Sequence, residues 1–165
     1  MGDMKNHFKY IIMSLLLGSC VSVELPGGKV TAAKDVEFSE PGGDYSKIKS
    51  KGADRAWQSS KTGNTISYIS ECGGNTDASL QTLETESLSA LNKLEVLKTE
   101  EKIFNGRASR QTTSVGSIDG VPVALSLVVF KKNGCNYTLS YGGVEKQFNS
   151  ELPVFENFKA NFKAP

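Results

Sequence analysis

The segment VPVALSLVVFKK, residues 121–132, is the most apolar strand that the sequence predicts. A strand places alternate side chains on opposite faces. One face would carry Val, Leu, Leu and Val at positions 123, 125, 127 and 129, and the other Ala, Ser, Val and Phe at 124, 126, 128 and 130. Because both faces are mostly apolar, we expect this strand in the middle of a sheet that is covered on both sides.

Tight-turn signals lie on both sides of this strand. The turn pairs are Asn105-Gly106, Asp119-Gly120 and Asn133-Gly134, which favour two-residue hairpin loops. They separate predicted strands over residues 98–104, 107–118, 121–132 and 136–141, and the last places Cys135, Tyr137, Leu139 and Tyr141 on one face. This order predicts an antiparallel meander.

Another hairpin precedes the meander. Two β-rich runs, residues 54–59 and 65–70, flank a Gly-Asn turn. The period of two places Ile66, Tyr68, Ser70 and Cys72 on one side of the second strand. Trp57, the only tryptophan, is interpreted as a core anchor, with a ligand platform as the alternative.

Two helices are predicted, one between the strands and one at the end. The first runs over residues 78–94 with Asp77 as its cap, and its core-facing stripe is Leu80, Leu83, Leu91 and Leu94. The second opens at residues 150–153 with Pro153 in its first turn. Its aromatic stripe, expected to dock on the sheet, is Phe155, Phe158 and Phe162.

These elements predict an α+β fold, an α/β/α sandwich with an antiparallel meander, one long helix between strands and a C-terminal helix on the sheet. The order resembles the PsbP-like fold, which is shared by a photosystem extrinsic protein, a nuclear-import release factor and bacterial lipoproteins of the DcrB type. The resemblance rests on the strand pair 57–72, the helix 78–94 and the Phe-rich ending, and covers residues 36–163. It implies a non-catalytic adaptor or envelope protein, and no family site matches these positions.

The first 20 residues predict an export signal. Lys5 and Lys9 precede an apolar run over residues 10–17, which is too short to span a bilayer, since a spanning helix needs about 20 residues. The run ends in Leu17-Gly18-Ser19-Cys20. This ending resembles the lipobox of bacterial lipoproteins, in which the cysteine is acylated and becomes the first mature residue. Cys20 is therefore the predicted lipidation site.

Two alternatives to lipidation remain for this segment: a signal that is cleaved without acylation, and a buried core segment. Val21 follows the cysteine, and the resemblance to enterobacterial lipoproteins then favours the outer membrane over the inner one. The predicted organisation is a signal peptide at 1–19, a partly disordered tether at 20–50 and one α+β domain at 51–165. A short strand near residues 36–38 is expected within the tether.

The charge balance argues against a nucleic-acid partner. The chain holds 19 basic and 18 acidic residues, and residues 1–19 contain two lysines and one aspartate, so 17 of each sign remain. Nucleic acid attracts clustered Lys and Arg, which a neutral, mixed surface does not supply. The basic run over residues 47–51, KIKSK, is interpreted as a solvated loop.

The cysteines match an exported protein. With Cys20 lipidated, Cys72 and Cys135 remain, and two thiols in an oxidising compartment predict one disulfide. Two free buried thiols are the alternative. The single histidine, His7, lies in the signal, so neither a zinc site nor any cofactor is predicted.

Catalytic residues are sparse in this sequence. Without a histidine after residue 19, Ser-His-Asp and Cys-His arrangements are excluded. The densest carboxylate groups are Glu84-x-Glu86, expected on a solvated helix face, and Glu100-Glu101 at a strand start. Arg107 and Arg110 are candidate binding residues, because they would present cations at one end of the sheet.

The function predicted from the sequence is a non-enzymatic, membrane-anchored envelope lipoprotein that binds a protein or cell-wall partner. Acylated Cys20 would hold it to membrane lipid. The alternative is a small-ligand carrier or a carboxylate-based hydrolase of the envelope. Its pocket walls would be aromatic: Trp57, Tyr68, Tyr137 and Tyr141.

Overall fold

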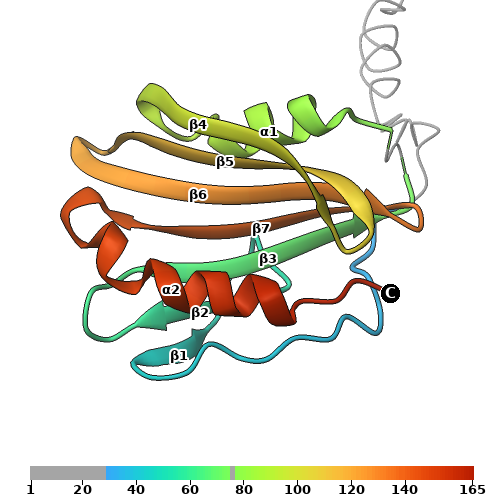
Figure 1. Cartoon of the computed structure of the whole chain (residues 1–165), viewed down its shortest axis with the longest axis horizontal. Helices are drawn as coiled ribbons and strands as arrows, with labels where there is room; N and C mark the ends of the chain where they lie inside the picture. The colour runs from blue at the N-terminus through green and yellow to red at the C-terminus, as the bar shows by residue number, and fades with distance from the viewer. Residues whose placement is uncertain (1–28, 75–76) are drawn as a thin grey trace, which may run out of the picture.

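The computed structural model describes residues 29–74 and 77–165, in which one seven-stranded antiparallel sheet is combined with two helices (Figure 1). The elements are β1 (Tyr45–Ile48), β2 (Arg55–Ser59), β3 (Thr65–Cys72), α1 (Leu80–Leu88), β4 (Asn92–Phe104), β5 (Arg107–Ile118), β6 (Val121–Lys132), β7 (Cys135–Val144) and α2 (Glu145–Asn161). The strand order is β1-β2-β3-β7-β6-β5-β4. Strands β4 to β7 form the predicted meander, and β3 joins it by pairing with β7.

Strand β6 lies inside the sheet between β5 and β7, and both of its faces are covered, as predicted. Leu127, Val128, Val129 and Phe130 are each at most 2% exposed. Helix α2 packs on the face of Val128 and Phe130, and α1 contacts β5 and β6 on the other face (Figure 1). The three layers are therefore α/β/α.

The three predicted hairpin turns are confirmed by their backbone angles. Both residues of each pair have positive φ: 52° and 74° at Asn105-Gly106, 50° and 81° at Asp119-Gly120, and 49° and 76° at Asn133-Gly134. Positive φ at both central residues matches the right-handed twist of the flanking strands. These turns set the register of the meander.

Helix α1 is shorter than the sequence predicted, and the expected end at Leu94 is wrong. The helix ends at Leu88, and β4 begins at Asn92, which pairs with Ser117 of β5. Pairing with a 12-residue neighbour supplies backbone hydrogen bonds that outweigh local helical spacing. The predicted cap is also wrong, since Ser79 and not Asp77 accepts the hydrogen bond from the N–H of Thr82.

Helix α2 begins earlier than predicted, at Glu145, so Pro153 lies inside the helix and not in its first turn. A proline inside a helix removes one hydrogen bond to the carbonyl four residues earlier. Here that carbonyl belongs to Asn149, and both Asn149 and Pro153 are exposed, so water can reach the freed group. The buried stripe begins with Phe148 and continues through Phe155 and Phe158.

The predicted tether at 20–50 is corrected for the residues that the structure describes. Thr31 pairs with Cys72, and Glu37, inside the expected short strand at 36–38, forms only an isolated bridge with Lys163. Residues 45–48 form β1, and Tyr45 is buried. Apolar and aromatic anchors thus draw this Gly- and Pro-containing segment onto the domain before residue 51. The signal at 1–19 and Cys20 lie outside the described residues.

A disulfide joins Cys72 and Cys135, as predicted. The two cysteines are register partners at the ends of β3 and β7, and 63 positions separate them in sequence. The bond therefore fastens the first hairpin to the meander. A cross-link over a segment of this length restricts the unfolded chain strongly.

Candidate functional site

Three of the predicted binding residues are core residues. Trp57, Tyr68 and Tyr141 are 1%, 5% and 0% exposed, respectively. The ring of Trp57 lies 5.5 Å from those of Phe38 and Phe158. The core-anchor interpretation of Trp57 therefore fits its position, and none of the three aromatics lines the two hollows described below.

A buried carboxylate, Glu151 of α2, lies at the centre of a polar cluster that the sequence did not reveal. Its oxygens accept hydrogen bonds from the hydroxyls of Tyr45 at 3.1 Å, Ser59 at 2.8 Å and Thr62 at 2.5 Å. Asn64 Nδ2 lies 3.4 Å from the same carboxylate and donates to the Tyr141 hydroxyl at 2.8 Å. The cluster fastens α2 to β1 and to the β2–β3 turn.

The backbone of β7 makes room for this cluster. Gly143 lies directly against Asn64, because a Cβ atom on Gly143 would come within 1.8 Å of Asn64 Oδ1. No side chain larger than hydrogen fits there without displacing Asn64. Glycine at 143 is therefore needed for the close approach of the turn to the sheet.

Hydrogen bonding keeps Glu151 ionised. Burial opposes the charged form, but hydrogen bonds from Thr62, Ser59 and Tyr45 outweigh it and hold the pKa of Glu151 below its usual value. Burial, followed by the nearby charge of Glu151, raises the pKa of Tyr45 well above its ordinary value. An ionised carboxylate that is enclosed and fully hydrogen-bonded is suited to holding elements together and not to proton transfer.

A second buried carboxylate corrects another expectation. Glu84 was expected on a solvated helix face, but it is 6% exposed and points from α1 to β5. Arg110 Nε donates a hydrogen bond of 2.8 Å to Glu84 Oε2. Arg110 Nη2 forms an ion pair with the same oxygen at 2.7 Å. Thr112 and Thr99 donate to Glu84 Oε1. This ion pair fastens α1 to the sheet.

The structure does not bring the two candidate arginines together. Arg110 is held by Glu84 and, at 3.1 Å, by Glu101. Arg107 is exposed at the β4–β5 turn and lies on the opposite face of β5 from Arg110, because the two are three positions apart and side chains alternate along a strand. Of the two candidate arginines, Arg107 remains an exposed cation, whereas Arg110 has a structural role.

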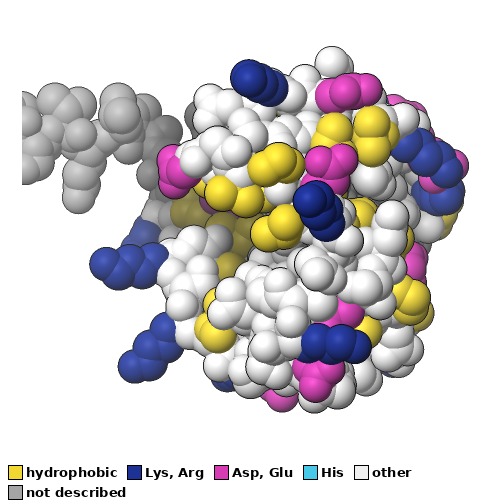
Figure 2. Space-filling view, turned by 90° about the vertical axis from the view of Figure 1, so that its left-hand side faces the viewer, with side chains coloured by type: hydrophobic (Ala, Val, Ile, Leu, Met, Phe, Trp, Pro, Cys, Tyr) yellow, Lys and Arg dark blue, Asp and Glu magenta, His cyan; other side chains and the backbone are white. Residues whose placement is uncertain are grey.

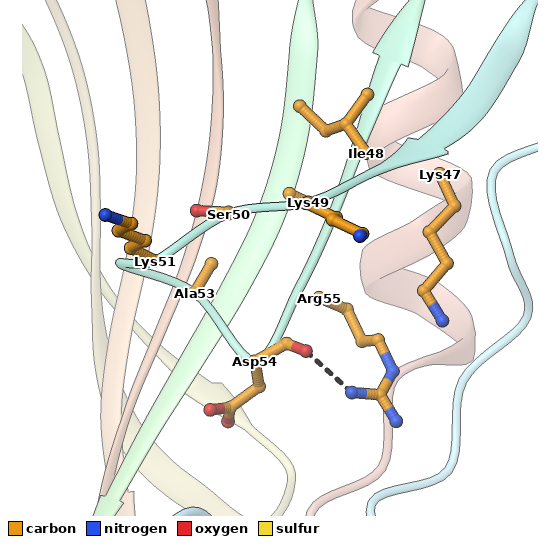
Figure 3. Close-up of a pocket in the computed structure, with 9 residues that line it drawn as sticks. Lys47, Ile48, Lys49, Ser50, Lys51, Ala53, Asp54 and Arg55 are labelled. Carbon is orange, nitrogen blue, oxygen red and sulfur yellow. Dashed lines mark hydrogen bonds between the residues drawn. The ribbon is translucent and has the colours of Figure 1, made fainter.

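The β1–β2 connection forms a hollow of about 540 Å³, and four of its nine lining residues are cationic (Figure 3). Lys47, Lys49, Lys51 and Arg55 are exposed, and none forms an ion pair with a described Asp or Glu. We call residues 47–55 the basic loop. The sequence showed the lysine run, but not its lack of ion pairs.

The acidic residue of the basic loop faces the sheet. Asp54 Oδ2 accepts hydrogen bonds from Ser70 N at 2.9 Å and Ser70 Oγ at 2.5 Å. Figure 3 shows the Asp54 carboxylate turned away from the lysine side chains. The backbone carbonyl oxygen of Asp54 accepts a hydrogen bond from Arg55 Nη1 at 2.7 Å. Within the described residues, the four cations of the loop therefore have no ion-pair partner.

A second hollow, of about 270 Å³, is apolar and lies beside the end of α1. Leu91, Ile118, Val123 and Leu125 line part of it. Exposed Ile118, Val121 and Val144 lie at the same end of the sheet, and we call this surface the apolar end. Figure 2 shows this end, where hydrophobic side chains are interspersed with charged ones of both signs.

Among the described residues there is neither a metal-binding cluster nor a helix able to span a membrane. Residues 29–74 and 77–165 hold no group of three or more His, Cys, Asp or Glu side chains placed to bind a metal ion. Neither helix in that part of the chain has the length and apolar character that crossing a membrane requires.

Comparison with known proteins identifies the fold. No family model matches the chain, and no curated protein matches it in sequence. The crystal structure of LpqN, "involved in cell envelope biogenesis of Mycobacterium tuberculosis", superposes with a TM-score of 0.58 at 16% identity, over 86% of this chain and 87% of LpqN. The solution structure of cyanobacterial PsbP (CyanoP) from Synechocystis sp. PCC 6803 superposes with a TM-score of 0.54 at 16% identity, over 90% of this chain and 99% of CyanoP.

The chain therefore has the PsbP-like fold that the resemblance predicted, built as an antiparallel sheet between two helices. At this level of identity the likeness defines the fold alone. Function has to be argued from the residues of this chain.

Arg110→Ala tests the fastening of α1. We expect the free energy of unfolding to fall by about 2–4 kcal/mol, because removal of one partner leaves a buried charge on Glu84 uncompensated. Arg107→Ala is the matched control and should change it by less than about 0.5 kcal/mol. Urea unfolding followed by circular dichroism measures both, and equal effects of the two variants would contradict a structural role for Arg110.

Glu151→Gln tests the second fastening through its pH dependence. The folded-state pKa of Glu151 lies below the ordinary 4.5, so its contribution is complete above that pH and is lost as the pH falls through the folded-state pKa. We expect the variant to lose about 1.5–3 kcal/mol at pH 7 and the difference to shrink toward pH 3. Glu145→Gln, exposed on the same helix, is the control, and a pH-independent loss in Glu151→Gln would refute the charge-based account.

Proposed function

We propose that this protein is a cell-envelope lipoprotein, anchored through acylated Cys20, whose domain is a non-catalytic binding module. The export signal and the Leu17–Cys20 lipobox support the anchor. The disulfide fits an oxidising compartment outside the cytoplasm. LpqN, which shares the fold, is described as involved in cell envelope biogenesis, and an envelope role for this chain is consistent with that description.

The proposal that the domain is non-catalytic is supported by the hydrogen bonding of its buried carboxylates. Glu84 and Glu151 are the two buried acidic side chains of the described residues, and each is taken up by hydrogen bonds that fasten a helix. General acid–base work needs a group within hydrogen-bond reach of a bound substrate. Both carboxylates are enclosed by the protein and cannot contact a bound substrate, so neither supports the alternative of a carboxylate-based hydrolase.

The carrier alternative rests on the apolar hollow beside α1. Its volume, about 270 Å³, falls below the roughly 300–1,000 Å³ typical of small-molecule pockets, and the hollow of about 540 Å³, which falls within that range, is lined by four exposed cations and by none of the expected aromatics. The aromatics that were expected to form pocket walls are packed in the core instead. A surface that binds a protein or cell-wall partner fits this closed body better. Outer-membrane placement, on the periplasmic face, remains part of the proposal because Val21 follows Cys20.

Cys20→Ala tests the anchor. We expect the variant to lose metabolic labelling with a palmitate analogue and to leave the membrane fraction, because it lacks the thiol that carries the acyl chains. The double variant Cys72→Ala/Cys135→Ala, which retains Cys20, should still be labelled. Unchanged labelling of Cys20→Ala would end the lipoprotein assignment.

Photo-crosslinking in intact cells tests the binding role. A crosslinking amino acid at Ile118 or Val121, in the apolar end, or at Arg107 should give a discrete adduct with one protein or with cell-wall material. The same amino acid at Gln81 or Asn157, on exposed faces of the two helices, provides matched control positions. If all positions give the same diffuse adducts, the domain has no specific partner and the binding role fails.

A further inference from the structure

The basic loop concentrates positive charge in a chain whose basic and acidic residues are equal in number after residue 19. Lys47, Lys49, Lys51 and Arg55 fall within nine residues, and their single acidic neighbour, Asp54, is engaged by Ser70. Figure 3 shows Lys47, Lys49 and Arg55 extending toward one side of the loop and Lys51 toward the other. The cations are spread and do not converge on one point. This arrangement suits an extended anionic surface better than a single small anion.

The basic loop lies beside the path of the chain from its anchor. Thr31 pairs with Cys72, and Ala33 N donates to Ser70 Oγ at 2.8 Å. Ser70 is also the residue that binds Asp54, so the incoming segment and the basic loop meet on one serine. Both occupy the same edge of β3, since β2 pairs with β3 only up to Tyr68.

The distance to the anchor is limited by covalent geometry. Lys29 follows Cys20 by nine positions, and at about 3.5 Å per position the chain between them spans at most about 32 Å. A tether of that length raises the effective concentration of the loop at the bilayer surface. Two hydrophobic side chains beside this path, Ile48 at 36% and Val30 at 53% exposure, are available to contact the interface.

We propose that the basic loop binds the anionic phospholipid headgroups of the leaflet that holds the anchor, as a second membrane contact. This inference rests on the proposed function, because it requires acylated Cys20. Lysines near an anionic bilayer are attracted within a Debye length of about 8 Å, and the attraction is weakened by salt. The contact would orient the domain with the β2–β3 turn and the apolar end away from the membrane.

The test uses the full lipidated protein, reconstituted into vesicles of phosphatidylcholine alone or with one-third phosphatidylglycerol. Flotation reports the anchor, and the rate of amine acylation at each lysine, read by mass spectrometry, reports the contact. On anionic vesicles we expect Lys47, Lys49 and Lys51 to react about tenfold more slowly than on neutral ones, and 0.5 M salt to restore their rate. Lys93 and Lys146, which flank the far end, should react equally on both.

Charge-matched variants separate the loop from net charge. Lys49→Gln/Lys51→Gln should largely remove the protection of Lys47, whereas Lys93→Gln/Lys146→Gln removes the same charge and should leave it intact. Equal loop rates on both vesicles, with flotation on both, would overturn the membrane contact and leave the anchor standing. Flotation with neither vesicle overturns both proposals. Flotation with anionic vesicles alone overturns the anchor and, with it, a second contact that requires the anchor. Protection by soluble polyphosphate but not by anionic vesicles would also overturn the contact.

Discussion

The structure depends on covering both faces of one strand. Leu127, Val128, Val129 and Phe130 of β6 are consecutive and buried, so the sheet is stable only with cover on each side. Removing apolar surface from water is the dominant favourable contribution to folding. A sheet with two such faces needs two helices, and the antiparallel meander leaves one helix to come before it and one after it. The α/β/α order follows from this single requirement.

Each covering helix is fastened by one buried carboxylate. Glu84 ties α1 to β5 through Arg110, and Glu151 ties α2 to β1 and to the β2–β3 hairpin through three hydroxyl groups. The two clusters differ in their desolvation cost. The Glu84–Arg110 ion pair removes two charges from water, whereas the hydroxyl donors around Glu151 are neutral, so that cluster removes only one. Such groups contribute modestly to net stability. Their directional bonds select one position for each helix over the sliding alternatives that apolar contact alone would permit.

Local features were predictable from sequence, and contacts between distant segments were not. The alternation in residues 121–132 and the three turn pairs act within a few residues, so the sequence was sufficient for the meander. The end of α1 was not predictable, because Leu91 and Leu94 continue the helical spacing while Asn92 pairs with Ser117, 25 positions away. The same limit hid Glu84, which resembles a solvated helix residue until the fold places Arg110 against it.

The basic loop shows how a neutral chain acquires a polar orientation. Counting charges gives no preferred face, because basic and acidic residues are equal in number after residue 19, where the predicted signal ends. The fold breaks that balance: Glu84 and Glu101 neutralise Arg110, Glu100 pairs with Lys98 and Lys102, and Asp54 bonds to Ser70. Four of the cations that form no ion pair with a described acidic residue, those of the basic loop, lie beside the segment that arrives from the predicted anchor. The domain then has two distinct ends. The basic loop is suited to a charged surface, and the apolar end is suited to an apolar partner.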